Sequence, residues 1–127
     1  MSKALGDEGG VVIITQVVPH FNSSLKAIRE YQQDIKSYSA KALPSFVSLE
    51  GYIAAKIFVE GLRKAGKDIT REAIVDGIES IKGMDIGIGT AVSYSKTIHQ
   101  ASHEVWPTRI MKNEIIPFDW KSLNQPK

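Results

Sequence analysis

A run of β-branched residues near the N-terminus limits most strongly what this chain can fold into. The run extends from Val11 to Val18 and is interrupted only by Gln16. It follows a pair of glycines and ends at Pro19, which has no N–H to donate to a neighbouring strand. Because apolar and polar residues do not alternate, we expect a strand covered on both faces, as in a parallel sheet. This feature favours an α/β fold.

The segment Phe46–Ala65 is predicted to be a long helix. Ser45 is a suitable N-cap, and Gly66 is the expected residue just beyond the C-terminus. The apolar residues of this helix extend well beyond one stripe, so we expect other elements to pack on most of its sides. Gly51 and several alanines in it also allow a second backbone to approach closely.

Two shorter helices are predicted on either side of the long one. The first follows a cap at Asn22 or Ser23 and ends near residues 40–42. The second spans Arg71–Ile81 and is capped by Thr70, with four apolar residues predicted to face inward: Ile74, Val75, Ile78 and Ile81.

The C-terminal part of the chain changes to a period close to two, which is typical of strands. Residues 90–94 and Glu104–Met111 are predicted strands, and Lys112 to Glu114 form a turn into Ile115 and Ile116. We therefore expect the chain to end in a β-hairpin.

Size and composition are those of one ordinary globular domain. The chain has 127 residues, of which 43% are hydrophobic and 24% are charged, and this length buries roughly two thirds of the unfolded surface. A net charge of +2 is too small to favour binding to nucleic acid or to an anionic membrane. There is no cysteine, which excludes a disulfide framework, and no apolar run long enough to span a bilayer. The first residues lack the apolar core of a signal peptide, so we expect a soluble chain without an export signal.

The sequence contains no convincing catalytic, metal or cofactor motif. His99 and His103 have the spacing of a helical zinc site, but the polar segment around them favours a turn. Gly87-Ile88-Gly89 lacks the third glycine of a dinucleotide-binding loop. No serine lies in a nucleophile-elbow pattern. We therefore predict that the protein is not an enzyme and uses no cofactor.

Two further features have both a structural and a functional interpretation. Five basic residues near the end of the long helix suggest a phosphate-binding patch, but the helix dipole and interleaved acidic residues favour a structural role: Lys56, Arg63, Lys64, Lys67 and Arg71. Phe46 and Val47 lie in the first turn of the long helix, where an aromatic ring can line a pocket. From the residues alone, core packing is the favoured interpretation for these two residues.

The order of these segments resembles a known family. Three stretches carry the resemblance: Val11 to Pro19, Pro44 to Lys56 with its Ser-Leu-Glu-Gly-Tyr sequence, and Gly61 to Glu72 with Ala-Gly-Lys-Asp. Together with Asp85-Ile86-Gly87, they are similar to the carboxy-terminal third of the type I periplasmic solute-binding proteins of branched-chain amino-acid ABC transporters. The resemblance covers about residues 5–118.

The resemblance implies a partial Rossmann-like lobe of a two-lobed protein that closes on an amino acid or small carboxylate and delivers it to an ABC-transporter permease. By similarity, residues 11–20 form a strand and a hinge crossing, 21–103 form the helical part of a lobe, and 104–118 form the returning strands. Phe46 falls where the family often presents an aromatic ring to the ligand, and His20 and Phe21 fall at the edge of the cleft. The parent protein is implied to be periplasmic or extracellular.

The chain lacks parts that supply most of the binding site in this family, namely most of the first lobe's sheet and the segment that contributes an acidic group. We therefore expect the isolated chain to bind the ligand poorly. Because the strand at residues 11–18 and the long apolar helix lack neighbours, we also expect a homo-oligomer, most simply a twofold dimer. The alternative function is a structural or interaction module that is stable only as an oligomer.

Overall fold

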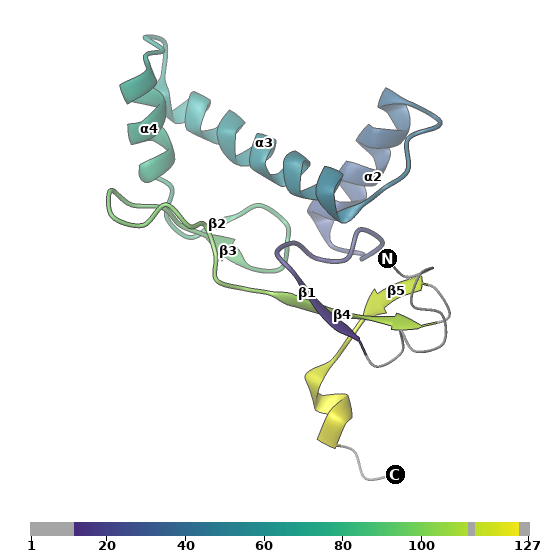
Figure 1. The fold of residues 1–127 in the computed structure, drawn as a ribbon. Helices are drawn as coiled ribbons and strands as arrows, with labels where there is room; N and C mark the ends of the chain where they lie inside the picture. Colours follow the sequence, from purple (N-terminus) through teal and green to yellow (C-terminus); the bar gives the residue numbers. More distant parts are fainter. Residues whose placement is uncertain (1–11, 112–113, 125–127) are drawn as a thin grey trace. The chain divides into compact units, whose positions relative to one another are not determined.

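The computed structural model describes residues 12–111 and 114–124, which form two compact units (Figure 1). The strand unit consists of the described residues up to His20 and those from Val105 onward. The helical unit is Phe21–Glu104. Along the described residues, one strand, three α-helices, a short β-hairpin, a C-terminal β-hairpin and a 3-10 helix (Trp120–Asn124) follow one another, which confirms the predicted α/β class. Among the described residues, no helix combines the length and apolarity that a bilayer crossing requires.

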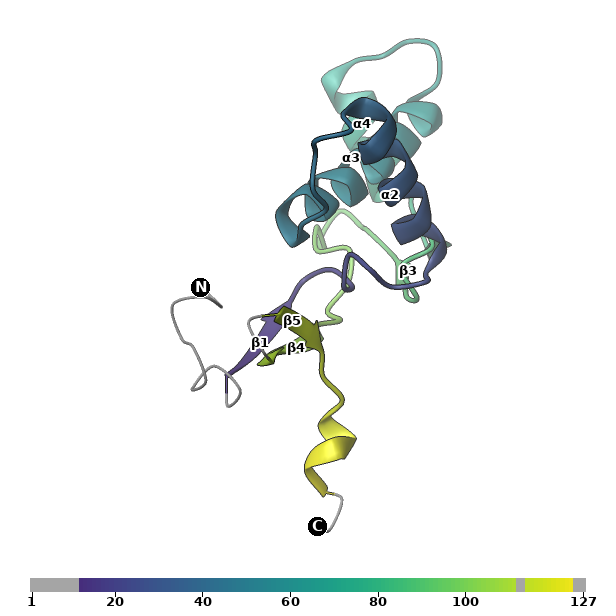
Figure 2. The ribbon, with the colours of Figure 1, turned by 90° about the vertical axis from the view of Figure 1, so that its right-hand side faces the viewer.

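The strand unit contains a three-stranded sheet (Figure 2). Strands β1 (Ile13–Gln16), β4 (Trp106–Met111) and β5 (Glu114–Pro117) lie in the order β1-β4-β5, and both pairs are antiparallel. Strands β4 and β5 form the predicted hairpin. The predicted turn residues Lys112 and Asn113 lie outside the described residues.

The prediction that the first strand belongs to a parallel sheet is wrong for the described residues. Strand β1 pairs with β4 in the antiparallel direction, and the buried Thr108 donates its hydroxyl to the carbonyl oxygen of Ile14 at 2.9 Å. Val17 is 64% exposed, so the apolar run is not covered along its whole length. A β-branched run favours an extended backbone, but the segment that reaches its edge decides the direction of pairing.

The helical unit contains α2 (Lys26–Tyr38), α3 (Phe46–Ala65), α4 (Arg71–Glu79) and a short hairpin of β2 (Met84–Asp85) and β3 (Ala91–Val92). The predicted strand at residues 90–94 is thus reduced to β3, and β2 was not predicted. Helices α2 and α4 both pack on α3 (Figure 1). The core of this unit consists of apolar side chains from α2, from α3 and from the segment after α4: Ala27, Ile28, Tyr31, Leu49, Ile53, Ile57, Ile81, Ile86, Ile88 and Val92.

Two of the three predicted N-caps are confirmed. The hydroxyls of Ser45 and Thr70 accept hydrogen bonds from the third residue of α3 and α4, respectively. Helix α2 instead begins after Leu25, whose side chain makes no cap, so the predicted caps at residues 22 and 23 are wrong. The backbone N–H of Ala27 donates to the carbonyl oxygen of Gly87 at 3.0 Å, so a distant segment supplies the acceptor that a cap normally provides.

The inward face of α4 differs from the predicted one at one position. Ile81 is fully buried just beyond the end of the helix, but Val75 is 45% exposed. The helix meets α3 through Gly77 and Ile78, which places Val75 away from the contact. Close approach of the two backbones therefore decides which side of α4 is buried.

The contact between α3 and α4 depends on two glycines. A Cβ atom on Gly77 would lie 2.5 Å from the carbonyl oxygen of Gly61 and 3.1 Å from the backbone nitrogen of Ala65. Neither backbone atom can yield without moving the helix. Gly51, by contrast, has open space where its Cβ would be.

We predict that Gly77→Ala destabilises the chain by about 1–3 kcal/mol, because the added methyl group forces the two helices apart. The matched control is Gly51→Ala, which we expect to stabilise α3 by up to about 1 kcal/mol, since alanine is a better helix former and meets no neighbour. Urea unfolding of both variants measures the difference. Equal effects of the two substitutions would contradict this helix contact.

Candidate ligand-binding site

The start of α3, which carries the predicted ligand-binding residue Phe46, is held by a buried tyrosine of α2. Tyr31 is only 2% exposed, and its hydroxyl accepts a hydrogen bond from the backbone N–H of Ser45 at 3.0 Å. The same hydroxyl lies 2.6 Å from the hydroxyl of Ser48, which also contacts the Ser45 side chain at 2.9 Å. This network attaches the first turn of α3 to α2.

Further along the same helix pair, side chains of α2 and α3 form two more polar contacts. Tyr52 donates its hydroxyl to the Asp34 carboxylate at 2.7 Å, and Lys56 forms an ion pair with Glu30. Burial is the main cause that raises the pKa of Tyr52, and the hydrogen bond to Asp34 and the nearby negative charges add to it. The rings of Tyr31 and Tyr52 lie 5.5 Å apart. Together these contacts keep α2 and α3 in register.

Phe21 and Phe46 form an aromatic pair at the start of α3. Their ring centroids are 4.9 Å apart with an interplanar angle of 73°, which is an edge-to-face arrangement. Both side chains are half-buried. The Gln32 side-chain amide donates to the carbonyl oxygen of Phe21 at 2.7 Å and holds this segment against α2. The structure therefore brings two of the three predicted site residues together.

His20, the third predicted residue, belongs to the strand unit, although it directly precedes Phe21 in the sequence. Its Nε2 atom lies 2.8 Å from the carbonyl oxygen of Ile115 in β5. Because a carbonyl oxygen can only accept, Nε2 carries the proton and donates it. This hydrogen bond links the end of the first strand segment to the C-terminal hairpin.

Val47, considered with Phe46 as a pocket or core residue, is 80% exposed. The two neighbours therefore have different environments, because only Phe46 packs against Phe21. Sequence periodicity alone could not separate them, since both are apolar and lie in the same helical turn.

The two histidines considered as zinc ligands, His99 and His103, do not form a metal site with other ligands in the described part of the chain. His99 lies in the segment between β3 and β4, and its Nε2 is 2.9 Å from a carboxylate oxygen of Glu79. His103 is exposed. Among residues 12–111 and 114–124, no group of three or more His, Asp or Glu side chains is placed to hold a metal ion.

The glycines considered as a dinucleotide loop have a structural role. Gly87 and Gly89 have φ angles of 84° and 85°, and a Cβ on Gly87 would lie 2.9 Å from the backbone nitrogen of Ala27. Ile86 and Ile88 are buried within the same segment. The glycines thus allow this turn to pack against the start of α2.

The basic residues near the end of α3 are partly neutralised by acidic neighbours. Lys56 pairs with Glu30, and Arg63 lies 3.4 Å from Glu60 one turn away. Exposed pairs of this kind contribute little to stability, but they lower the local positive charge. The structure therefore agrees with the structural interpretation of this cluster.

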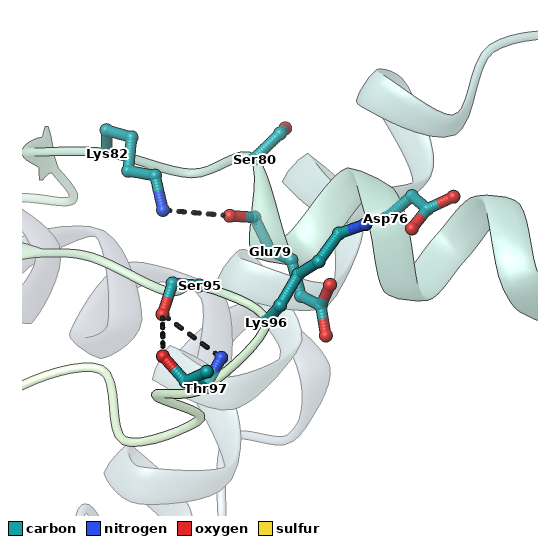
Figure 3. Close-up of a pocket in the computed structure, with 7 residues that line it drawn as sticks. All are labelled: Asp76, Glu79, Ser80, Lys82, Ser95, Lys96 and Thr97. Carbon is teal, nitrogen blue, oxygen red and sulfur yellow. Dashed lines mark hydrogen bonds between the residues drawn. The ribbon is translucent and has the colours of Figure 1, made fainter.

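A polar cavity of about 560 Å³ lies beside the end of α4 (Figure 3). Lys82 donates to the carbonyl oxygens of Glu79, at 3.1 Å, and of Tyr94, while Ser95 contacts Thr97 at 3.3 Å. Sequence analysis did not single out these residues. The Lys82 hydrogen bonds to backbone carbonyl oxygens join the end of α4 to the segment after β3, so the lining of the cavity has a structural role.

The comparison with protein families shows which family this chain belongs to. The periplasmic binding protein family model matches residues 1–114, which is most of the chain. This chain belongs to the periplasmic binding protein family. The resemblance expected from the sequence is thereby confirmed.

Solved structures agree with this assignment. A possible leucine/isoleucine/valine-binding protein from Rhodopirellula baltica is 36% identical, with a TM-score of 0.89 over 98% of this chain. A substrate-binding periplasmic protein from Ralstonia solanacearum is 28% identical, with a TM-score of 0.73 over 84%. A fatty acid ABC transporter substrate-binding protein from Thermomonospora curvata, 24% identical over 89% of this chain with a TM-score of 0.67, shares the fold.

This periplasmic binding protein chain spans about a third of each receptor that it matches. It covers 34% of the R. baltica protein, 31% of the R. solanacearum protein and 32% of the T. curvata protein. Among curated proteins, none matches this chain. The family is a solute-binding class rather than a class of enzymes.

We predict that Phe21 and Phe46 stabilise each other by about 0.5–1.5 kcal/mol beyond the area they bury, because their rings pack edge to face. A double-mutant cycle with Phe21→Leu and Phe46→Leu, measured by urea unfolding, gives this coupling energy. The control cycle pairs Phe21 with Phe58, which lies three turns further along α3. A coupling no larger than that of the control would show that the ring contact is not formed.

Proposed function

We propose that this chain forms one wall of the solute-binding cleft of an ABC-transport receptor, together with one of its hinge segments. The ligand is an amino acid, or an aliphatic or aromatic carboxylate. The observation that carries this proposal is the Phe21–Phe46 pair, which stands at the tethered start of α3 in a chain of the periplasmic binding protein family.

The chemistry of the aromatic pair suits the apolar part of such a solute. Aromatic rings provide a rigid apolar surface, and the N-terminal turn of α3 adds backbone N–H groups with partial positive charge. The R. baltica protein, whose name refers to leucine, isoleucine and valine, supports branched-chain amino acids as the first ligands to test. His20 is a further proposed ligand-binding residue, on the family resemblance.

The rest of the site is proposed to come from other parts of the receptor. A small-molecule site normally encloses roughly 70–90% of its ligand, whereas this chain supplies about a third of a receptor. The parent receptor is proposed to be periplasmic or extracellular and to deliver its solute to an ABC-transporter permease. We propose no catalytic role and no interaction with nucleic acid.

A hybrid receptor tests this function, with the present chain replacing the matching third of the R. baltica protein. We expect the hybrid to bind leucine, isoleucine or valine in calorimetry, and the isolated chain to show no micromolar binding. Phe46→Ala is expected to weaken binding by the hybrid roughly tenfold or more, because a buried aromatic contact is lost. Tyr38→Ala is the control, since Tyr38 is 90% exposed at the end of α2.

Two results would contradict the proposal. The first is micromolar binding by the isolated chain, which would mean that the parts of a receptor outside this chain are not needed for the site. The second is a hybrid whose solute affinity is unaffected by Phe46→Ala, which would remove this residue from the cleft wall.

The alternative function is a structural or interaction module in which the isolated chain associates with itself. Strand β1 is at the edge of the described sheet, and apolar residues of α3 such as Val47 and Phe58 are exposed. Unpaired strand edges and apolar patches favour association. Ligand-dependent stabilisation of the hybrid receptor separates the two functions, since the hybrid is stabilised by solute only if this chain contributes to a solute-binding cleft.

We predict that the isolated chain is a homodimer at micromolar concentration, because strand pairing or helix exchange covers these surfaces. Static light scattering across a dilution series measures the mass. A mass equal to that of one 14.0 kDa chain at every concentration would contradict the prediction.

A further inference from the structure

A cavity of about 400 Å³ lies between α2 and α3, within the helical unit. Most of its wall is apolar or aromatic and includes side chains of Tyr31, Ile35, Ala42 and Tyr52. None of the three residues proposed for the solute cleft lines it. Pockets for small molecules have volumes of about 300–1,000 Å³ and mainly apolar walls with a few polar groups. The cavity is therefore large enough for a small ligand.

The charge of this cavity is negative. Among the described residues that line it, Asp34 alone is charged. Tyr52 donates its hydroxyl to one carboxylate oxygen of Asp34, Oδ2, at 2.7 Å. In the described part of the chain, no side chain bonds to the other oxygen, Oδ1, and no cation pairs with Asp34. Because both oxygens of a carboxylate accept hydrogen bonds, Oδ1 is available to a ligand.

Glu30, one turn earlier on α2, shows how the same pair of helices binds a cation. Its carboxylate forms an ion pair with Lys56. The Lys56 ammonium group also lies 5.8 Å from the centroid of the Tyr52 ring, which is within the range of a cation–π contact. A carboxylate and a tyrosine ring thus hold this ammonium group together. Asp34 and the neighbouring tyrosine rings provide the same types of group, and the described residues supply no cation for them.

The position of Asp34 in α2 also favours a positively charged ligand. Asp34 lies one turn before the last residue of the helix. The C-terminal end of a helix carries a partial negative charge, which disfavours a carboxylate and attracts a cation. Asp34 is therefore not explained by helix stability, and its hydrogen bond to Tyr52 accounts for only one of its two oxygens.

We propose that this cavity binds a small organic ammonium ion with an apolar body, such as an arylalkylamine. The ammonium group donates a hydrogen bond to Oδ1 of Asp34, and the apolar body packs against Tyr52 and Ile35. A carboxylate in the same place is repelled by Asp34. The ligand class thus differs in charge from the carboxylates proposed for the solute cleft, and this site does not depend on that function.

Three probes that share a phenyl ring test the proposal on the full chain: the cation 2-phenylethylamine, the neutral 2-phenylethanol and the anion 3-phenylpropanoate. We expect saturable binding of the amine in an NMR titration, with the largest amide shifts at Asp34, Ile35 and Tyr52. The alcohol is expected to bind roughly fivefold or more weakly than the amine, because a charge-assisted hydrogen bond is lost. The anion is expected not to bind.

Two substitutions change the charge and the shape of the cavity separately. Asp34→Asn removes the charge but keeps an acceptor for Tyr52, so we expect amine binding to weaken about tenfold and alcohol binding to stay the same. Ala42→Leu fills the cavity, so we expect it to weaken the binding of both probes. It also tests the site if Asp34→Asn does not fold.

The matched control is Asp68→Asn, which removes the same charge from an exposed position between α3 and α4. We expect it to change amine binding less than twofold, because Asp68 does not line the cavity and exposed charges are screened by salt. A tenfold loss in Asp34→Asn beside a silent control supports the proposal.

Four results would overturn it: the amine shows no saturable binding; the anion binds as well as the amine; Asp34→Asn and Asp68→Asn weaken binding equally; or the amide shifts centre on Phe46 instead of Asp34 and Tyr52. Solute binding by the hybrid receptor is a separate measurement. The failure of either proposal is therefore distinguishable from the failure of the other.

Discussion

The packing of other elements on one face of α3 is the interaction on which the helical unit depends. Leu49, Ile53 and Ile57 form the centre of its core, and helices α2 and α4 both rest on α3. The approach of α4 is limited by backbone rather than by side chains, since Gly61 and Gly77 meet where a methyl group would not fit. Protein interiors are packed as densely as organic crystals, so the position of α3 determines the positions of its neighbours.

The candidate site follows from the same packing. Tyr31 is buried between α2 and α3, and its hydroxyl reaches the first turn of α3, where Ser45 and Ser48 complete the network. This places Phe46 beside Phe21 in an edge-to-face pair. A polar network in the core thus positions an apolar surface at its edge, which is the surface that we propose to contact solute.

The parts of the fold that depend on nearby residues were predictable. Ser45 and Thr70 cap their helices because the bonded N–H groups lie three residues away, and Gly66 follows α3 with a φ angle of 82°. The start of α2 was not predictable in this way. Its first-turn N–H at Ala27 is satisfied by Gly87, sixty residues away, which no local pattern reveals.

In the candidate site, too, local features were predictable from the sequence and contacts between distant segments were not. The first-turn position of Phe46 is a local property, and its assignment to a ligand came from family resemblance. The contact of Phe46 with Phe21 and the network around Tyr31 join separate segments, so the sequence contained no pattern that predicts them. Val75 is an example from outside the site. The helical period of α4 was predicted correctly and placed Val75 on the buried side, but this residue is exposed in the structure.

By itself, the sequence determined that this is an α/β chain of the periplasmic binding protein family, with a long helix whose apolar residues exceed one stripe. Helical period, capping residues and apolar content are local, and local energies decide them. Only the tertiary structure decided that β1 pairs antiparallel with β4, that glycines set the contact between α3 and α4, and which face of α3 is left uncovered. These features depend on contacts between distant segments. The direction of strand pairing is decided by the strand that pairs, and the buried face of a helix is decided by the element that packs on it.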